Sequence, residues 1–337
     1  MLSDAQPFRI GTRTSPMAMA QARLVRDHLA RTTDVPTEIV GVETSGDRWY
    51  GDLSELGGKG AFLREVDRRL LAGEIDIAVH SVKDVPGDEA EPEGTEFTAY
   101  LRRQEALDAL VLRKGSRYRT LSELPPGTRV GTSAVRRRGQ LLKHRPDLHV
   151  VRIRGNVNQR LEHMDGDNTC EGLILNAGGL ARAELGDRIS QVIPRELLCP
   201  AVGAGVVGAR LRSEDTEVVG LLKDLDDPGT RLAVTAERAM LQRLRGDCGS
   251  PVAGHCTVEE DGALSLIGMV FSDCGGMFLH EQAQGPASGA EALGERVAEA
   301  LLSQGARPLL TPDRRAREER AAMQRRARAQ YPRHAPW

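Results

Sequence analysis

"FRIGTRTSPMAMAQARLVRDHLA", residues 8–30, predicts a strand, a loop and a helix in direct succession. The apolar start "FRI" is typical of a short strand, and Ser15 followed by Pro16 is typical of a helix cap and first turn. Apolar residues then recur near helical spacing, at Met17, Ala20, Leu24 and Leu29. We therefore expect one face of this helix to be buried.

The alternation of strands and helices continues along the next stretch. "TEIVGV" (37–42) and "IDIAV" (75–79) predict strands, and "AFLREVDRRLLAGE" (61–74) predicts a helix. Residues 43–60 are rich in glycine and polar residues, which indicates a mobile loop. Strands that alternate with helices predict a mainly parallel sheet with helices on both faces.

The same alternation restarts after "SELPPGT" (122–128). Further strands are predicted at 129–133, 149–153 and 172–176, with a basic helix at 134–144 and another from about residue 156. Two similar units suggest two lobes with a cleft between them, and in open sheets ligands bind beyond the carboxyl ends of the strands. Residues just past predicted strand ends are therefore expected to converge on one site: Arg13, Asp84, Ser133 and Arg154.

A third, smaller α+β unit is predicted after residue 226. A helix starts near Pro228, "GALSLIGMVF" (262–271) is typical of a strand, and 289–305 predicts another helix. Residues 313–337 are rich in arginine and alanine, with almost no large aliphatic residues. We expect a solvated tail there, with a basic interaction arm as the alternative.

The overall composition limits the class of protein. A chain of 337 residues should divide into two or three domains. A net charge of -2 and an aromatic content of 3% argue against nucleic acid as a partner. No apolar run is long enough to span a membrane and no signal peptide is recognised, so we expect a cytoplasmic protein. Five cysteines without a CxxC pair predict reduced thiols, and we expect no metal site.

Two glycine-rich motifs invite nucleotide-binding hypotheses. "GGKGAF" (57–62) fails the Walker pattern, because Leu53 and Gly60 occupy positions that need glycine and serine or threonine. A flexible loop carrying Lys59 is the better interpretation. "GAGVVG" (203–208) matches GxGxxG, but Pro200 precedes it and no clear helix follows. We favour a glycine-rich return strand over a dinucleotide site.

Arginines recur in the turn-rich segments. Each alone is typical of a solvated surface charge, but their recurrence in strand-end loops favours an anionic ligand, since guanidinium groups match carboxylates and phosphates. Carboxylates are favoured because no phosphate loop is present. The arginines are Arg13, Arg136, Arg137, Arg154, Arg160 and Arg182.

Asp84 and Cys248 each allow two interpretations. Asp84 is either an ordinary turn residue before Pro86 or a carboxylate in a cationic cleft, where it would stabilise a transient positive charge or move a proton. Cys248, in "GDCGSP", is either a buried thiol or an exposed nucleophile. His255 and Cys256 make a metal cluster conceivable, but their spacing is poor.

Taken together, these segments resemble the porphobilinogen deaminase (hydroxymethylbilane synthase) family from about residue 8 to residue 312. The resemblance is carried, in family order, by "GTRTSPMAMAQA", "GGKGAF", "DIAVHSVKDVP", "GTSAVRRR", "RGNVNQRL", "PAVGAGVVG", "RLAVTAERAM" and "GDCGSPV". It implies a monomeric α/β enzyme with two lobes like those of periplasmic binding proteins, built on mixed, mainly parallel sheets, and a small α+β third domain. The implied domains are 1–104 with 205–225, then 105–204, then 226–312.

The resemblance also implies a reaction and a site. The family condenses four porphobilinogen molecules head to tail, with release of ammonia, into hydroxymethylbilane. Cys248 would anchor a dipyrromethane cofactor through a thioether, and Asp84 would be the catalytic carboxylate facing the cationic azafulvene left when ammonia departs. Lys83, Ser133, Arg136 and Arg137 would bind the cofactor; Arg13, Ser15, Arg154, Arg160 and Arg182 the substrate; and Lys59 and Phe62 would belong to an active-site loop.

One departure from the family pattern lies near these residues. Ala134 stands where many members carry a second serine, which removes one possible hydrogen bond to a cofactor carboxylate. Two rival classes also stay open on the residues alone. One is a non-catalytic two-lobed binding module for an anion, which leaves Cys248 without a purpose, and the other is a nicotinamide oxidoreductase built on "GAGVVG".

Overall fold

The strand, loop and helix predicted at the start of the chain form in the structure, a computed structural model that describes residues 7–48, 60–247, 249–272 and 274–310. The Ser15 side chain accepts a hydrogen bond from the backbone N–H of Ala18 (3.3 Å), and Pro16 occupies the first turn of α1. The strand is longer than "FRI" and ends at Arg13. The cap therefore fixes where the chain turns from strand to helix.

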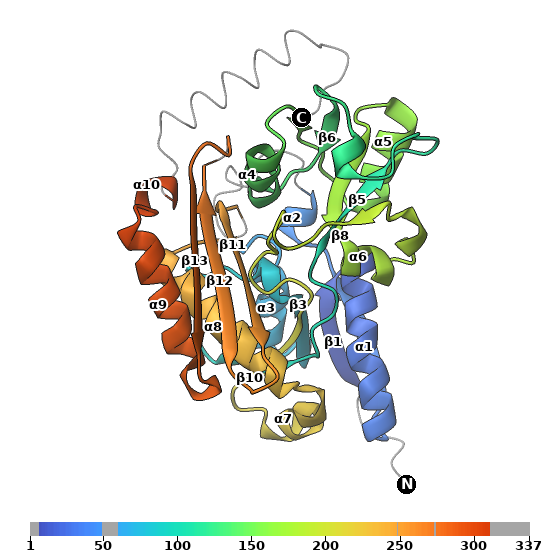
Figure 1. Cartoon of the computed structure of the whole chain (residues 1–337). Helices are drawn as coiled ribbons and strands as arrows, with labels where there is room; N and C mark the ends of the chain where they lie inside the picture. Colours follow the sequence, from blue (N-terminus) through green and yellow to red (C-terminus); the bar gives the residue numbers. More distant parts are fainter. Residues whose placement is uncertain (1–6, 49–59, 248, 273, 311–337) are drawn as a thin grey trace.

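The first sheet has the strand order β2-β1-β3-β10-β4. Helices α1 and α3 pack against its strands, and its largest core cluster also contains residues of α7 (Figure 1). The elements are β1 (Phe8–Arg13), α1 (Pro16–Thr32), β2 (Thr37–Val42), α3 (Arg64–Leu71), β3 (Ile77–Ser81), β4 (Thr95–Tyr100), β10 (Val207–Arg212) and α7 (Thr216–Leu222).

The second sheet repeats this plan, with the strand order β7-β6-β8-β5-β9. Its elements are β5 (Asp108–Leu112), β6 (Arg129–Gly131), α4 (Val135–His144), β7 (His149–Val151), α5 (Val157–Asp167), β8 (Gly172–Asn176), α6 (Ala177–Arg182) and β9 (Gln191–Val192). The α/β class and the two similar lobes are confirmed.

Both sheets are mixed, as predicted. The prediction that parallel pairings would predominate in them is wrong. Each sheet has two parallel and two antiparallel pairings. The reason is the strand that arrives from the other lobe. β10 enters the first sheet antiparallel between β3 and β4, and β5 enters the second sheet antiparallel between β8 and β9.

The chain crosses between the two sheets twice, at 101–107 and at 193–206. The crossings are hydrogen-bonded to each other, since the N–H of Gln104 donates to the carbonyl of Gly205 (2.9 Å). Gly205 has φ +77°, and a Cβ there would lie 2.3 Å from the Gln104 carbonyl oxygen. "GAGVVG" therefore leads into β10 and opens no helix. The return-strand interpretation is confirmed, and the dinucleotide-loop hypothesis is wrong.

The third unit is an antiparallel sheet covered by two helices (Figure 1). The predicted helix at Pro228, the strand and the last helix are confirmed, whereas β11 and β13 were not predicted. β13 alternates between half-buried and exposed residues and carries little apolar signal. The elements are α8 (Pro228–Leu244), β11 (Val252–Val258), β12 (Leu264–Phe271), β13 (Phe278–Gly285), α9 (Ala290–Ser303) and α10 (Arg307–Leu310).

Short helical turns complete the described part of the chain. A single turn, α2 (Ser45–Arg48), lies in the segment predicted as a loop. The 3-10 turns are η2 (Val82–Asp84), η3 (Leu121–Glu123), η4 (Gly186–Arg188), η5 (Lys223–Leu225) and η6 (Ala287–Gly289). No helix among the described residues is both long and apolar enough to cross a membrane.

Close packing of α9 on α8 generates a stability prediction. A Cβ on Gly294 would lie 2.2 Å from the Ala236 carbonyl oxygen and 2.8 Å from the Met240 nitrogen. We expect Gly294→Ala to lower the free energy of unfolding by about 1–3 kcal/mol through overpacking, measured by urea titration. Gly220→Ala in α7, where nothing lies within 4 Å, is the control. It should be neutral or stabilising by up to about 1 kcal/mol, and equal losses in both variants would contradict the prediction.

Candidate active site

Arg13, the last residue of β1, is held from three sides. Its guanidinium donates two hydrogen bonds to Asp47, lies 4.1 Å above the ring of Phe62, and has Nη1 3.7 Å from Oδ2 of Asp84. Burial acts to raise the pKa of Asp47, but hydrogen bonds from Arg13 and Thr44 lower it below its ordinary value. Asp47 therefore acts as a fixed counter-charge, and nothing in the sequence marked it.

Lys83 and Asp84 lie side by side on the η2 turn that follows β3. The turn is fastened to the return crossing, because the N–H of Val82 donates to the carbonyl of Val206 (3.1 Å). The pKa of Lys83 is lowered, first by burial and then by the positive charges of Arg137 and Arg182. A lysine of the first lobe thus faces arginines of the second lobe.

The second lobe gathers further positive charge. Burial, together with the charges of Arg137 and Arg154, lowers the pKa of Arg160 to about 10. Arg160 donates to the carbonyl of Gly155 (2.7 Å), and Arg182 donates to the side-chain oxygen of Gln104. Within the described residues, the buried Nε atoms of Arg137 and Arg182 have no hydrogen-bond partner. These cations are brought together with few acids to balance them.

The remaining predicted site residues are placed as follows. Ser133 is half-buried just after β6, and the hydroxyl of Ser15 is occupied as the cap of α1. Arg136 is buried, with its terminal nitrogens donating to Asp108 and to the carbonyl of Cys199. Lys59 and Cys248 lie outside the described residues.

A small recess opens beside Asp84, with a volume of about 20 Å³. That volume admits about one water molecule. The recess is bounded by Arg13 and Phe62 on one side and by Ser81, whose hydroxyl accepts from Nε2 of Gln21 (2.8 Å), on another. Its wall also includes His80, which is paired with Asp67 at 2.8 Å. Asp84 thus lies beside a recess lined by polar side chains that are themselves hydrogen-bonded.

Two α/β lobes whose facing loops carry clustered cations and one adjacent carboxylate define a site for a ligand with several negative charges. Comparison with known proteins identifies the family. Residues 8–220 match the family model for "porphobilinogen deaminase, dipyromethane cofactor binding domain", and residues 231–303 match "porphobilinogen deaminase, C-terminal domain". The chain is 45% identical over 310 residues to porphobilinogen deaminase 2 of Streptomyces coelicolor, covering 92% of this chain and 98% of that one. It is 42% identical over 305 residues to the porphobilinogen deaminase of Pelobacter propionicus, covering 90% and 96%. The chain belongs to the porphobilinogen deaminase family.

Solved structures give a more distant likeness. The VFT2 domain of BvgS from Bordetella pertussis is 15% identical, with a TM-score of 0.40, covering 65% of this chain and 86% of that one. The second substrate binding domain of a putative amino acid ABC transporter from Streptococcus pneumoniae is 12% identical, with a TM-score of 0.41, covering 64% and 90%.

As a member of its family, the chain is a transferase of tetrapyrrole biosynthesis. It condenses four porphobilinogen molecules, with release of ammonia, into hydroxymethylbilane, and it carries a dipyrromethane cofactor. The rival hypotheses of a non-catalytic binding module and a nicotinamide oxidoreductase are therefore wrong.

The residues present fit such a cofactor. A dipyrromethane made from porphobilinogen carries acetate and propionate groups, which are acceptors for guanidinium and ammonium donors. The unpartnered Nε atoms of Arg137 and Arg182 are buried donors of this kind. Burial lowers the pKa values of Lys83 and Arg160 first, and neighbouring arginines lower them further, so that each lies near other positive charges. Bound carboxylates would add negative charge there.

The family departure at Ala134 generates a prediction. Ala134 is the N-cap of α4 and has extended backbone, but it offers no side-chain hydrogen bond to the first turn. We expect Ala134→Ser to raise the free energy of unfolding by about 1 kcal/mol, because a serine hydroxyl can accept from that turn. Asn156→Ala, which removes the cap that accepts from the N–H of Gln159 (3.1 Å), should lower it by a similar amount. Urea titration of both variants measures this, and an unchanged Ala134→Ser midpoint would contradict the prediction.

Proposed function

We propose that Asp84 is the catalytic carboxylate of this transferase. The observation that carries the proposal is its place at a strand end beside Arg13 and Lys83, with the arginines of the second lobe facing the same turn. Asp47 and Asp108 accept hydrogen bonds from arginines, whereas Asp84 lies 3.7 Å from the guanidinium of Arg13. Asp84 is therefore the carboxylate best placed to face a positive charge that develops during the reaction.

The chemistry requires such a group. Loss of ammonia from porphobilinogen leaves a cationic pyrrole, and a carboxylate near its ring nitrogen stabilises that charge where it forms. Arg13, fixed by Asp47, keeps Asp84 in place and holds a substrate carboxylate on its remaining donors. When bound, the dipyrromethane supplies the pyrrole carbon to which the first porphobilinogen is joined.

The other cations divide between cofactor and substrate in this proposal. Each pyrrole brings an acetate and a propionate, so many donors are needed although the whole chain has a net charge of only -2. The cofactor group is Lys83, Ser133, Arg136 and Arg137; the substrate group is Arg13, Ser15, Arg154, Arg160 and Arg182; and Lys59 with Phe62 forms the active-site loop.

Cys248 is the proposed thioether anchor. Its neighbourhood supports this, because the N–H of Gly87, just after the catalytic turn, donates to the carbonyl of Gly246 (3.0 Å). The thiols of Cys170, Cys199 and Cys256 are poor alternatives. Burial raises their pKa values to about 11, 12 and 12, respectively, so that few thiolates are present at neutral pH.

The domain limits, the oligomeric state and the location are also proposals. Sheet membership supports a first domain of 1–104 with 205–225, a second of 105–204 and a third of 226–312, because β10 joins the first sheet. Residues 313–337, proposed as a tail, lie outside the described residues. We propose a monomer in the cytoplasm that takes porphobilinogen as its small-molecule substrate and binds neither nucleic acid nor membrane.

The anchor is tested by the intact mass of the denatured protein. We expect the purified chain, incubated with porphobilinogen, to carry an added mass equal to two porphobilinogen molecules less two of ammonia. Cys248→Ser should lack this mass, whereas Cys274→Ser, which alters an exposed cysteine of the third unit, should keep it. An adduct that survives in Cys248→Ser, or its absence from the unaltered chain after incubation, would refute the anchor.

The catalytic carboxylate is tested by Asp84→Asn. We expect kcat to fall by at least about 100-fold, the range that loss of a charge-stabilising group produces, while the cofactor mass is retained. Asp27→Asn, on the exposed side of α1, is the control and should keep its kcat. Turnover assayed with porphobilinogen decides, and a wild-type kcat in Asp84→Asn would remove Asp84 from the mechanism.

A further inference from the structure

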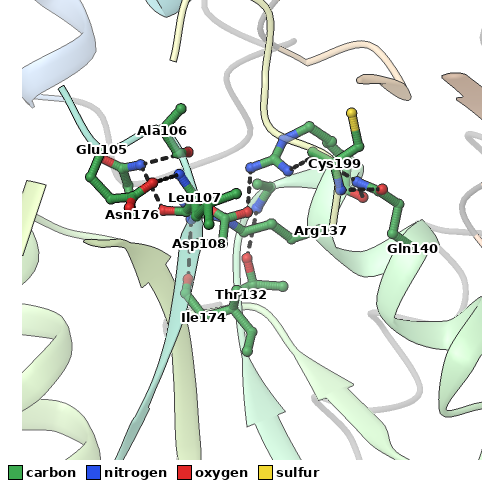
Figure 2. Close-up of polar contacts among 12 residues, drawn as sticks. Glu105, Ala106, Leu107, Asp108, Thr132, Arg137, Gln140, Ile174, Asn176 and Cys199 are labelled. Carbon is green, nitrogen blue, oxygen red and sulfur yellow. Dashed lines mark hydrogen bonds and ion pairs between the residues drawn. The ribbon is translucent and has the colours of Figure 1, made fainter. Parts of the chain in front are cut away.

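Arg136 and Arg137, two adjacent arginines in the first turn of α4, share one buried carboxylate, that of Asp108. Figure 2 shows Asp108 and Arg137. Arg136 donates from Nη2 to Oδ2 (2.6 Å), and Arg137 donates from Nη2 to Oδ1 (2.8 Å). Both carboxylate oxygens are therefore occupied, each by a different guanidinium. The carboxylate is held in one orientation and in turn fixes both arginines.

Asp108 is only 1% exposed, so its charge is stable there only because it is paired. Burial by itself would raise the pKa of Asp108, but the charges of Arg136 and Arg137 and their hydrogen bonds lower it below the ordinary value. One negative charge thus faces two positive ones, and these three groups together keep a net charge of +1.

Arg136 ties this pair to the return crossing. Its Nη1 donates to the carbonyl of Cys199, and Gln140, one turn further along α4, both accepts from the Cys199 N–H (2.8 Å) and donates to the Cys199 carbonyl (3.1 Å; Figure 2). Each terminal nitrogen of Arg136 therefore bonds a protein group, which holds Asp108 and α4 in place and leaves one further N–H on each nitrogen for the cofactor role proposed above.

Asp108 itself is fixed to the outgoing crossing. It is the first residue of β5, directly after Ala106 and Leu107. The side-chain nitrogen of Asn176 lies 3.1 Å from both of their carbonyl oxygens, so that β8 holds the crossing from the opposite side (Figure 2). Asp108 thus joins α4 to the outgoing crossing, as Arg136 joins it to the return crossing.

Arg137 lies near cations of both lobes. Beside its bond to Asp108, it donates to the carbonyl of Ile174 (3.1 Å), and its Nε is a buried donor that no described residue accepts from. Its charge acts on Lys83 of the first lobe and on Arg160 of the second. Of the two neighbours, Arg137 is the one whose charge acts on other proposed ligand-binding cations.

We infer that Asp108 is a positioning residue for the reaction, which aims the guanidinium of Arg137 at a carboxylate of the dipyrromethane and cancels one of the two adjacent charges. The inference rests on the proposed cofactor-binding role of Arg137. Without Asp108, the fork of Arg137 would keep only its bond to Ile174 and would be free to rotate away from the ligand.

The test measures how readily the cofactor is acquired. Full-length, cofactor-free chain, made in a host that cannot synthesise porphobilinogen, is incubated with graded porphobilinogen. Intact mass then gives the concentration at which half of the chains gain the dipyrromethane mass. We expect Asp108→Asn to raise this concentration about tenfold or more. Asp165→Asn, which breaks the pair with Arg188 (3.0 Å) elsewhere in the second lobe, should leave it within twofold.

A double-variant cycle separates this inference from the proposed function. Arg137→Gln alone should raise the half-loading concentration; if it does not, the proposed role of Arg137 fails. Because Asp108 acts through Arg137, adding Asp108→Asn to Arg137→Gln should produce less than a twofold further rise. A wild-type value in Asp108→Asn, or effects that multiply in the double variant, would overturn the inference while leaving the role of Arg137 intact.

A third variant decides the case if Asp108→Asn does not fold. Arg137→Lys leaves Asp108 paired with Arg136 and keeps the positive charge, but removes the planar fork that bridges Asp108 and Ile174. If the orientation of the Arg137 guanidinium matters, the half-loading concentration of Arg137→Lys should rise by about tenfold, as in Arg137→Gln. A value within twofold of wild type would show that charge alone suffices, and would overturn the inference.

Discussion

Repulsion between like charges is the constraint that shapes the cleft. Burial lowers the pKa values of Lys83 and Arg160 first, and the positive charges of neighbouring arginines lower them further, so cations of both lobes lie near one another. At an effective dielectric constant of 20, two unit charges 4 Å apart repel by about 4 kcal/mol. The fold offsets this with fixed acceptors: the carboxylates of Asp47 and Asp108 and the backbone carbonyls of Gly155 and Ile174. The ligand's carboxylates offset the remainder, so the site is electrostatically suited to a polyanion.

Local signals were enough to predict much of the fold. Ser15 with Pro16 correctly marked the start of α1, and the segment from Asn156 correctly marked α5, where the structure has a full capping box. Helix periodicity likewise located α8. These features depend on residues a few positions apart, which a single sequence displays directly. The motif-based placement of Lys83 and Asp84 on a strand-end turn was also correct.

Features that depend on distant residues could not be predicted in the same way. The antiparallel insertion of β10 between β3 and β4 depends on where the chain returns from the second sheet to the first. Asp47 and Asp108 are single acids in ordinary surroundings, and only the folded chain brings each to an arginine. Arg136 and Arg137 look equivalent in "VRRRG", but successive helix residues point about 100° apart. One therefore bonds to Cys199 while the charge of the other acts on Lys83.

The insertion of β10 also bears on the order in which the chain can fold as it is made. Every strand of the second sheet lies within residues 108–192, so that sheet has all its strands before β10 is synthesised. The first sheet lacks the strand that separates β3 from β4 until residue 212 is available. On the ribosome, the lobe that begins the chain is therefore the later of the two to close its sheet, and chains that stop before residue 207 leave β3 and β4 without their shared neighbour.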